Sequence, residues 1–209
     1  MTNPAPTTNG NGNGTGRRDG EATRQKLLRA ALELYTSDGF KETTTPAIAE
    51  RAGVAEGTIY RHFTSKEHLL NEAYRATFRW ALGVIKEVEE ADRTVRTPER
   101  LQRIGRRLVE VADRDAAAVR MLLFSREDRY LDNQSREVAR QFRDGLQQVI
   151  ASGKSDGLVR PGPAELWAGA WLALVAYAVE KVLTKEWNAE HPSVQQVLDA
   201  AWDAIGSRN

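Results

Sequence analysis

Side chains able to bind the phosphates and base edges of DNA are concentrated between Thr43 and Leu70. A helix over residues 56–62 would place Gly57 and Arg61 nearly opposite the apolar Ile59, because successive helical residues turn by about 100°. Hydroxyl and cationic side chains donate hydrogen bonds to phosphate oxygens, and a glycine allows a backbone to approach closely. The candidate DNA-binding residues are Thr44, Thr45, Glu56, Gly57, Thr58, Tyr60, Arg61, His62 and Lys66.

Two short helices joined by a glycine turn would position these residues. Thr45 is a favourable N-cap for the first helix, and Gly53 can adopt the left-handed conformation that ends it. Thr64 or Ser65 then caps a third helix, and a cap at Thr64 would form a capping box with Glu67. This arrangement is typical of a helix-turn-helix, whose second helix enters the DNA major groove. An ordinary corner between two helices has the same local pattern.

Several short runs in this stretch match one known DNA-binding head. They are Thr44-Thr45, Ile48-Ala49, Ala52-Gly53-Val54, Gly57-Thr58-Ile59-Tyr60, His62-Phe63, Ser65-Lys66-Glu67 and Leu69-Leu70. With the preceding run ATRQKLLRAALELYTSDGFKETT, they closely resemble the tetracycline-repressor (TetR) family of bacterial transcription regulators. The resemblance implies a homodimer with a DNA-binding domain at residues 21–70 and an effector-binding and dimerisation domain at residues 71–209. It also implies that the long helix after Leu70 transmits ligand binding to the head.

Two residues depart from the usual pattern of this head. Ala55 stands where the family often has a serine or another capping residue, so the recognition helix loses a cap worth about 1 kcal/mol. Glu56 stands where a neutral or basic residue often reaches DNA. A carboxylate there repels phosphate but can accept a hydrogen bond from the N4 amine of cytosine.

The composition is that of an ordinary globular protein. Of 209 residues, 41% are hydrophobic and 28% charged, and the net charge is +1, so DNA affinity has to come from local placement of charge. The chain has no cysteine, which excludes disulfides and thiolate metal sites and suits a reducing cytoplasm. No apolar export signal is present, and the apolar run at residues 166–183 contains Glu180 and Lys181, so we expect a cytoplasmic protein without membrane contact.

No motif indicates an enzyme or a cofactor. The three histidines, His62, His68 and His191, are too scattered for a metal site. Nucleophile-elbow, phosphate-loop and dinucleotide-binding motifs are missing, and most acidic residues alternate with Lys and Arg on helix faces.

Helical periodicity predicts an all-α fold of about nine helices, comprising a three-helix head and a larger helical body. Residues 1–20, rich in Asn, Gly, Thr and Pro, are expected to form a disordered tail. Pro163–Lys185 is apolar nearly all round, and Ser193–Ile205 has one clean apolar stripe. These last two helices are the expected dimer interface, through Trp171, Leu174, Ala178, Val197, Ala201 and Trp202. The alternative is that both helices are buried within one subunit.

Large side chains in the body are candidates for an effector pocket. They are Trp80, Met121, Phe124, Phe142, Trp167 and Trp171. Aromatic stripes at helical spacing also form plain core, and that alternative stays open for each residue. The scarcity of charge on the apolar faces favours an apolar or cationic effector. Arg107 and Arg120 would serve an acidic effector if they pointed inward.

The hypothesis from the sequence is a one-component transcriptional repressor, released from a palindromic double-stranded operator by a small, largely apolar effector. Its partners would be operator DNA, the effector and a second copy of the chain. The competing interpretation is a helical effector-binding or protein-interaction module without specific DNA binding, which Glu56 and the near-neutral charge keep open.

Overall fold

The computed structural model describes residues 13–91, 94–125 and 128–207, and in these ranges it is all-α, with an isolated antiparallel bridge between Val159 and Gly206. Nine α-helices and two short 3₁₀ helices occur in the described residues, which confirms the predicted fold class. They are α1 (Asn13–Ser37), α2 (Thr45–Ala52), η1 (Glu56–Thr58), α3 (Ile59–His62), α4 (Lys66–Ala91), α5 (Thr97–Arg114), α6 (Ala116–Phe124), η2 (Asp128–Tyr130), α7 (Asn133–Ser155), α8 (Ala164–Leu183) and α9 (Pro192–Asp203).

Helix α1 begins earlier than the sequence predicted. Its first residue is Asn13, so part of the expected tail at residues 1–20 is helical, and the head begins before the predicted boundary at Glu21. The rest of that tail, residues 1–12, lies outside the described residues. Composition was a poor guide here, because a helix already stabilised by tertiary packing can extend through residues of weak helix propensity.

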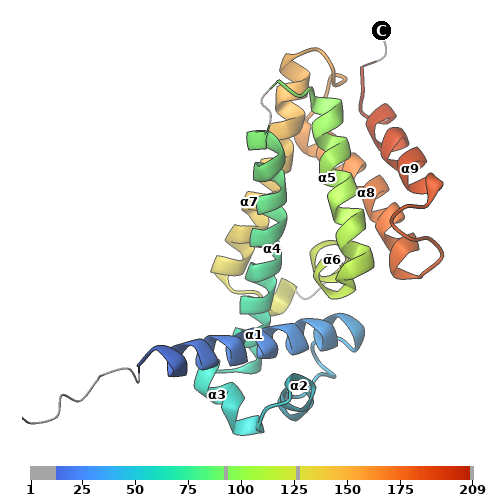
Figure 1. Cartoon of the computed structure of the whole chain (residues 1–209). Coiled ribbons are helices and arrows are strands. Elements are labelled where there is room, and N and C mark those ends of the chain that lie inside the picture. The colour runs from blue at the N-terminus through green and yellow to red at the C-terminus, as the bar shows by residue number, and fades with distance from the viewer. Residues whose placement is uncertain (1–12, 92–93, 126–127, 208–209) are drawn as a thin grey trace, which may run out of the picture.

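The head consists of α1, α2, η1–α3 and the start of α4, and it packs around fully buried side chains such as Leu27, Ile48, Ile59 and Leu70. Figure 1 shows α1 crossing the base of the body, with α2 and α3 on its outer side. The core of the head is continuous with that of the body, and the outer helices of the head face away from the body.

The turn chemistry of the head is mostly as expected, with one correction, and it decides between the two alternative caps of α4. Gly53 adopts the left-handed conformation, at φ 69° and ψ 37°, and ends α2. The N-cap of α2 is Thr44, not Thr45, and its hydroxyl accepts from the backbone N–H of Ala47. Ser65 caps α4 by accepting from the backbone N–H of His68, so the capping box with Glu67 does not form.

The body is a bundle in which α4 lies along α7, and α8 lies along α9 and packs on α5 and α7 (Figure 1). Asp115 separates α5 from α6 and caps α6 by accepting from the backbone N–H of Ala118. Trp171, Met121 and Phe142 lie in the bundle core, with 1%, 2% and 4% of their surface exposed. The bundle interior is therefore filled by its own side chains.

Helix α8 is the one helix in the described part of the chain that is long and apolar enough to cross a membrane. In this fold its inner face, including Trp171, Val175 and Val179, is buried against other helices of the body. The same length and composition are found in core helices of globular proteins.

Candidate nucleic-acid interface

The outer surface of the head is formed by the segment η1–α3 and the start of α2. Tyr60 is the most exposed large hydrophobic residue of the described chain, at 58%. Its hydroxyl lies 3.3 Å from the hydroxyl of Thr45, which joins α3 to α2 across the turn. The two oxygens therefore lie side by side on the outside of the head, where one hydroxyl donates to the other and the second keeps its proton for an external acceptor.

Gly57 lies on the same surface, and nothing in the fold requires a glycine there. A methyl group added at its Cα would meet no atom within 4 Å, and its φ is not in the left-handed range. The missing side chain therefore serves no intramolecular packing. It leaves a shallow site where another backbone can approach the start of the recognition segment.

Charged residues on this surface have both signs. Arg61 and Glu56 are exposed, and neither forms an ion pair within the described residues. Ala55 precedes η1 in an extended conformation and makes no side-chain capping hydrogen bond, as its residue type predicted. Arg61 can therefore contact a bound anion. The carboxylate of Glu56 would repel such an anion, but it can accept a hydrogen bond from a base amine.

Lys66 does not occupy the position expected of a phosphate ligand. Its ammonium donates inward to the backbone carbonyls of Phe40 and Thr43, both at 2.8 Å, and lies 4.3 Å from the centre of the Phe40 ring. A weaker contact reaches the carbonyl of Lys41 at 3.4 Å. These acceptors use the three protons of the ammonium. Lys66 therefore holds the α1–α2 connection against α4, and its role is to position the head.

A second polar cluster, which the sequence analysis missed, ties the head to the body; we call it the Arg75 clamp. Arg75 on α4 is buried, with 3% of its surface exposed. Its guanidinium donates to both carboxylate oxygens of Asp132, to the Ser135 hydroxyl and to Glu72. Glu72 also accepts from Arg24 on α1 at 2.6 Å. Two guanidiniums, of Arg24 and Arg75, and two carboxylates thus connect α1, α4 and the start of α7.

The electrostatics of the clamp favour the ionised forms. Burial raises the pKa of Glu72, but hydrogen bonds from Arg75 and Arg24 outweigh burial and hold that pKa below its ordinary value. Burial likewise raises the pKa of Asp132, and hydrogen bonds from the Ser135 backbone and from Arg75 lower it overall. The signal in the sequence was a buried helical stripe interrupted by polar residues at Asn71 and Arg75, four positions apart.

The six predicted pocket residues do not line one cavity. Met121, Phe142 and Trp171 belong to the core described above. Trp80 borders a small hollow against α1, α5 and α6, and Trp167 packs against Arg160. Phe124 alone of the six borders a cavity of about 420 Å³ between α1, α6 and α8.

The predicted dimer residues are also only partly on the surface. Trp171, Ala178 and Ala201 are buried within the subunit, so their assignment to an interface was wrong. Leu174, Val197 and Trp202 are half-exposed. The reason is geometric: a helix that is apolar nearly all round does not reveal which face its own subunit covers.

Comparison with known proteins now identifies the family. Residues 27–73 match the family described as bacterial regulatory proteins, tetR family, and residues 74–207 match the tetracyclin repressor-like C-terminal domain. The chain belongs to the TetR family. It is therefore a DNA-binding transcriptional regulator, and the interpretation as a module that lacks DNA binding is not retained.

Individual TetR-family proteins are similar over the head and much of the body. The transcriptional repressor KstR2 of Mycobacterium tuberculosis is 29% identical over 143 residues, which cover 66% of this chain and 70% of that protein. The regulator TcmR of Streptomyces glaucescens is 41% identical over 66 residues, covering 32% and 29%. A TetR-family regulator from Marinobacter aquaeolei VT8 shares the fold with a TM-score of 0.77 at 19% identity, covering 92% and 100% of the two chains.

Proposed function

We propose that this TetR-family regulator is a cytoplasmic homodimeric repressor that binds a palindromic operator and is released by a small molecule bound in its body. The observation that carries the proposal is the outer surface of the head, where Tyr60 and Gly57 are exposed, Thr45 is half-buried beside the Tyr60 hydroxyl, and Gly57 serves no packing contact within the subunit. The repressor KstR2 and other transcriptional repressors are among its relatives.

The docking mode follows from the positions of these groups. The segment η1–α3 enters the major groove with Glu56, Gly57, Thr58 and Arg61 nearest the bases. Thr44, Thr45, Tyr60 and His62 donate to the flanking phosphates. The N-terminus of α4 provides a further phosphate site. Ser65 caps only the backbone N–H of His68 there, which leaves the other N–H groups of the first turn for a phosphate. Lys66 contributes by fixing this geometry.

The second subunit is expected to cover the outer face of α8. Leu166 and Tyr177 there are 55% and 45% exposed, and Gly169 and Ala173, also exposed, lie between them at helical spacing. A methyl group added at Gly169 would meet no atom of its own subunit within 4 Å. A glycine in a helix costs roughly 1 kcal/mol relative to alanine, and close approach of a partner helix would explain it. Two-fold pairing through this face matches the symmetry of a palindrome.

Selection of bound sequences from a random duplex pool tests the DNA proposal. The expected result is an enriched palindrome with half-sites about one helical turn apart, or a multiple of it. Tyr60→Ala should abolish binding to that palindrome and leave the dimer intact. A pool that stays random with dimeric, effector-free protein would refute operator recognition.

Salt dependence separates phosphate contacts from structural effects. Arg61 is an exposed cation on the proposed DNA-facing surface, and its charge displaces counterions from the duplex when it enters the groove, so Arg61→Gln should reduce the slope of log K against log salt by up to about 1. The matched control is Arg103→Gln on α5, which removes an exposed arginine paired with Glu99 far along the body. Equal losses in both variants would contradict the assigned face.

Sedimentation of Leu166→Glu tests the dimer face. A carboxylate at that position should yield monomers, whereas Gln148→Glu adds the same charge to an exposed site on α7 and should leave the dimer unchanged.

A further inference from the structure

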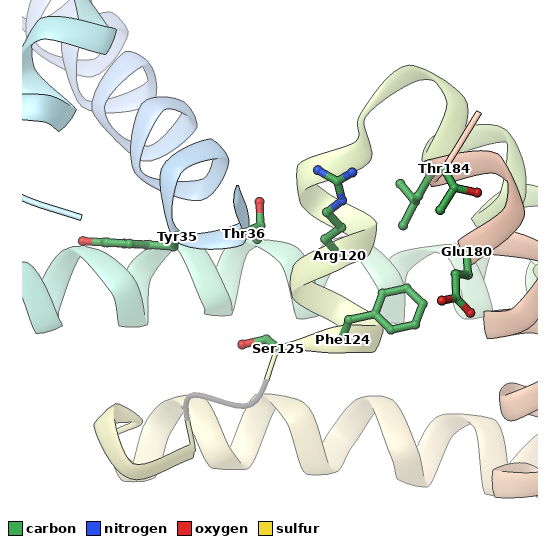
Figure 2. A pocket seen from close by; sticks show the side chains of 8 residues that line it. Tyr35, Thr36, Arg120, Phe124, Ser125, Glu180 and Thr184 are labelled. Atoms are coloured by element: carbon green, nitrogen blue, oxygen red, sulfur yellow. The ribbon is translucent and has the colours of Figure 1, made fainter. Parts of the chain in front are cut away.

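One cavity of the described chain lies at the junction of the head and the body. It has a volume of about 420 Å³ and is bordered by the end of α1, by α6 and by the end of α8. Figure 2 shows Arg120 and Phe124 on one face of α6, with side chains of α1 on one side and of α8 on the other. The volume is within the usual range for sites that hold a small organic ligand.

Arg120 is the group in this cavity that needs a partner. It is half-buried, and within the described residues it forms no recorded hydrogen bond or ion pair. The half-buried Arg24, elsewhere on α1, is by contrast satisfied by Glu72. An arginine fork without an acceptor in a partly dry site binds a planar carboxylate through two parallel hydrogen bonds. Among the lining residues Arg120 is the single cation.

The rest of the lining suits an apolar ligand body. Phe124 leaves 40% of its surface uncovered beside the cavity, and Leu183 borders it from α8. The hydroxyl of Thr36 is already used, because it donates to backbone carbonyls of α1. Glu180 is the single carboxylate among the lining residues and would repel a second negative charge on the ligand.

We infer that this cavity binds a monocarboxylate with an apolar tail, whose carboxylate pairs with Arg120 and whose tail packs on Phe124 and Leu183. This inference rests on the proposed function, since it specifies the effector of the repressor. The ligand would contact the head through Tyr35 and Thr36 on α1 and the body through α6 and α8. Binding therefore alters the head–body junction directly, and by linkage the carboxylate and the operator weaken each other.

Titration calorimetry with the DNA-free dimer tests the site, using decanoate, decanol and decylamine as probes. Decanoate should bind at least about tenfold more tightly than decanol, a difference of about 1.4 kcal/mol, and decylamine should bind more weakly still. Arg120→Gln should remove the preference for decanoate. Glu180→Gln should strengthen decanoate binding because it removes the repelling carboxylate.

The matched control is Arg107→Gln, which removes an exposed arginine of α5 that lies 3.7 Å from Glu110, outside the cavity. It should bind decanoate like the unsubstituted protein. The inference is overturned if decanoate and decanol bind equally, if decanoate does not bind below about 1 mM, or if the two arginine variants lose the same affinity.

Operator binding is measured separately in the same variants, so that the two proposals can fail independently. Arg120→Gln should bind the selected operator normally in the absence of ligand, and decanoate should release the unsubstituted protein but not this variant. Operator binding without any carboxylate binding refutes the cavity assignment alone. Carboxylate binding by a protein that selects no operator refutes the repressor proposal alone.

Discussion

Removing Asp132 from the Arg75 clamp should destabilise the fold by an amount that the structure allows us to divide into two parts. Asp132→Ala loses the N-cap of α7, where the carboxylate accepts from the Ser135 backbone N–H at 2.7 Å, at a cost of about 1 kcal/mol. It also removes one of two carboxylates from a buried guanidinium. Breaking a fully buried pair costs about 3–5 kcal/mol. Because 49% of the Asp132 side chain is exposed and Glu72 remains, we reduce this to about 1–2 kcal/mol.

The predicted loss is therefore roughly 2–3 kcal/mol for Asp132→Ala and about 1–2 kcal/mol for Asp132→Asn, because asparagine keeps the cap. Urea denaturation at a fixed protein concentration measures both values. Asp144→Asn is the matched control, since Asp144 is exposed on the same helix and forms no ion pair within the described residues. In an Arg75→Met background, Asp132→Asn should cost only a few tenths of a kcal/mol.

Acid should erase the difference between the unsubstituted protein and Asp132→Asn. The pKa of Asp132 is lowered in the folded state, so the carboxylate contributes stability that is fully present above the unfolded value, about 3.9. This contribution is lost as the pH falls through the lowered folded pKa. The gap in unfolding free energy should stay constant from pH 7 to about pH 5 and narrow below about pH 4. A gap that persists unchanged in acid, or a loss equal to that of Asp144→Asn, would refute the clamp.

Four further substitutions test separate parts of the fold. Lys66→Met should destabilise the head by about 1–3 kcal/mol, because backbone carbonyls lose a charged donor, yet leave the salt slope of operator binding unchanged; urea denaturation and salt titration measure the two effects. Gly83→Ala should raise stability by up to about 1 kcal/mol, because its added methyl group meets open space. Gly153→Ala should lower stability by about 1–3 kcal/mol, because its methyl group would lie 2.7 Å from a buried side-chain carbon. Thermal denaturation of the two variants compares these effects. Ala55→Ser should restore a cap and raise stability by about 0.5–1 kcal/mol, and unchanged stability would show that η1 does not depend on that cap.

Local signals in the sequence predicted the head well. Gly53 was predicted to end the first helix of the motif in a left-handed conformation, and it does so, because this effect acts within a few residues. The capping residues Thr44 and Ser65 were harder to assign. Neighbouring hydroxyls are equally able to cap, and only the final geometry decides between them.

Long-range features were not predictable in the same way. Lys66 reaches the carbonyl of Phe40 across 26 positions, and Arg75 meets Asp132 across 57, so no window of sequence contains both partners. Trp171 and Ala178 lie on the inner face of α8. Because that helix is apolar nearly all round, its sequence does not indicate which face is buried. Arg120 could be named as a candidate, yet its direction depends on how α6 packs against α1 and α8.

The Arg75 clamp divides helix α4 into two arms of unequal length. This helix has 26 residues, and Arg75 lies nine residues after Lys66 and sixteen before Ala91. At about 1.5 Å per residue, the arm toward the head is about 14 Å long and the arm toward the body about 24 Å. A rigid helix pivoting at the clamp would convert a displacement of about 3 Å at the body end into about 1.7 Å at the head. Under such a pivot, helix α4 would act as a reducing lever, moving its head end by less than its body end but with greater force.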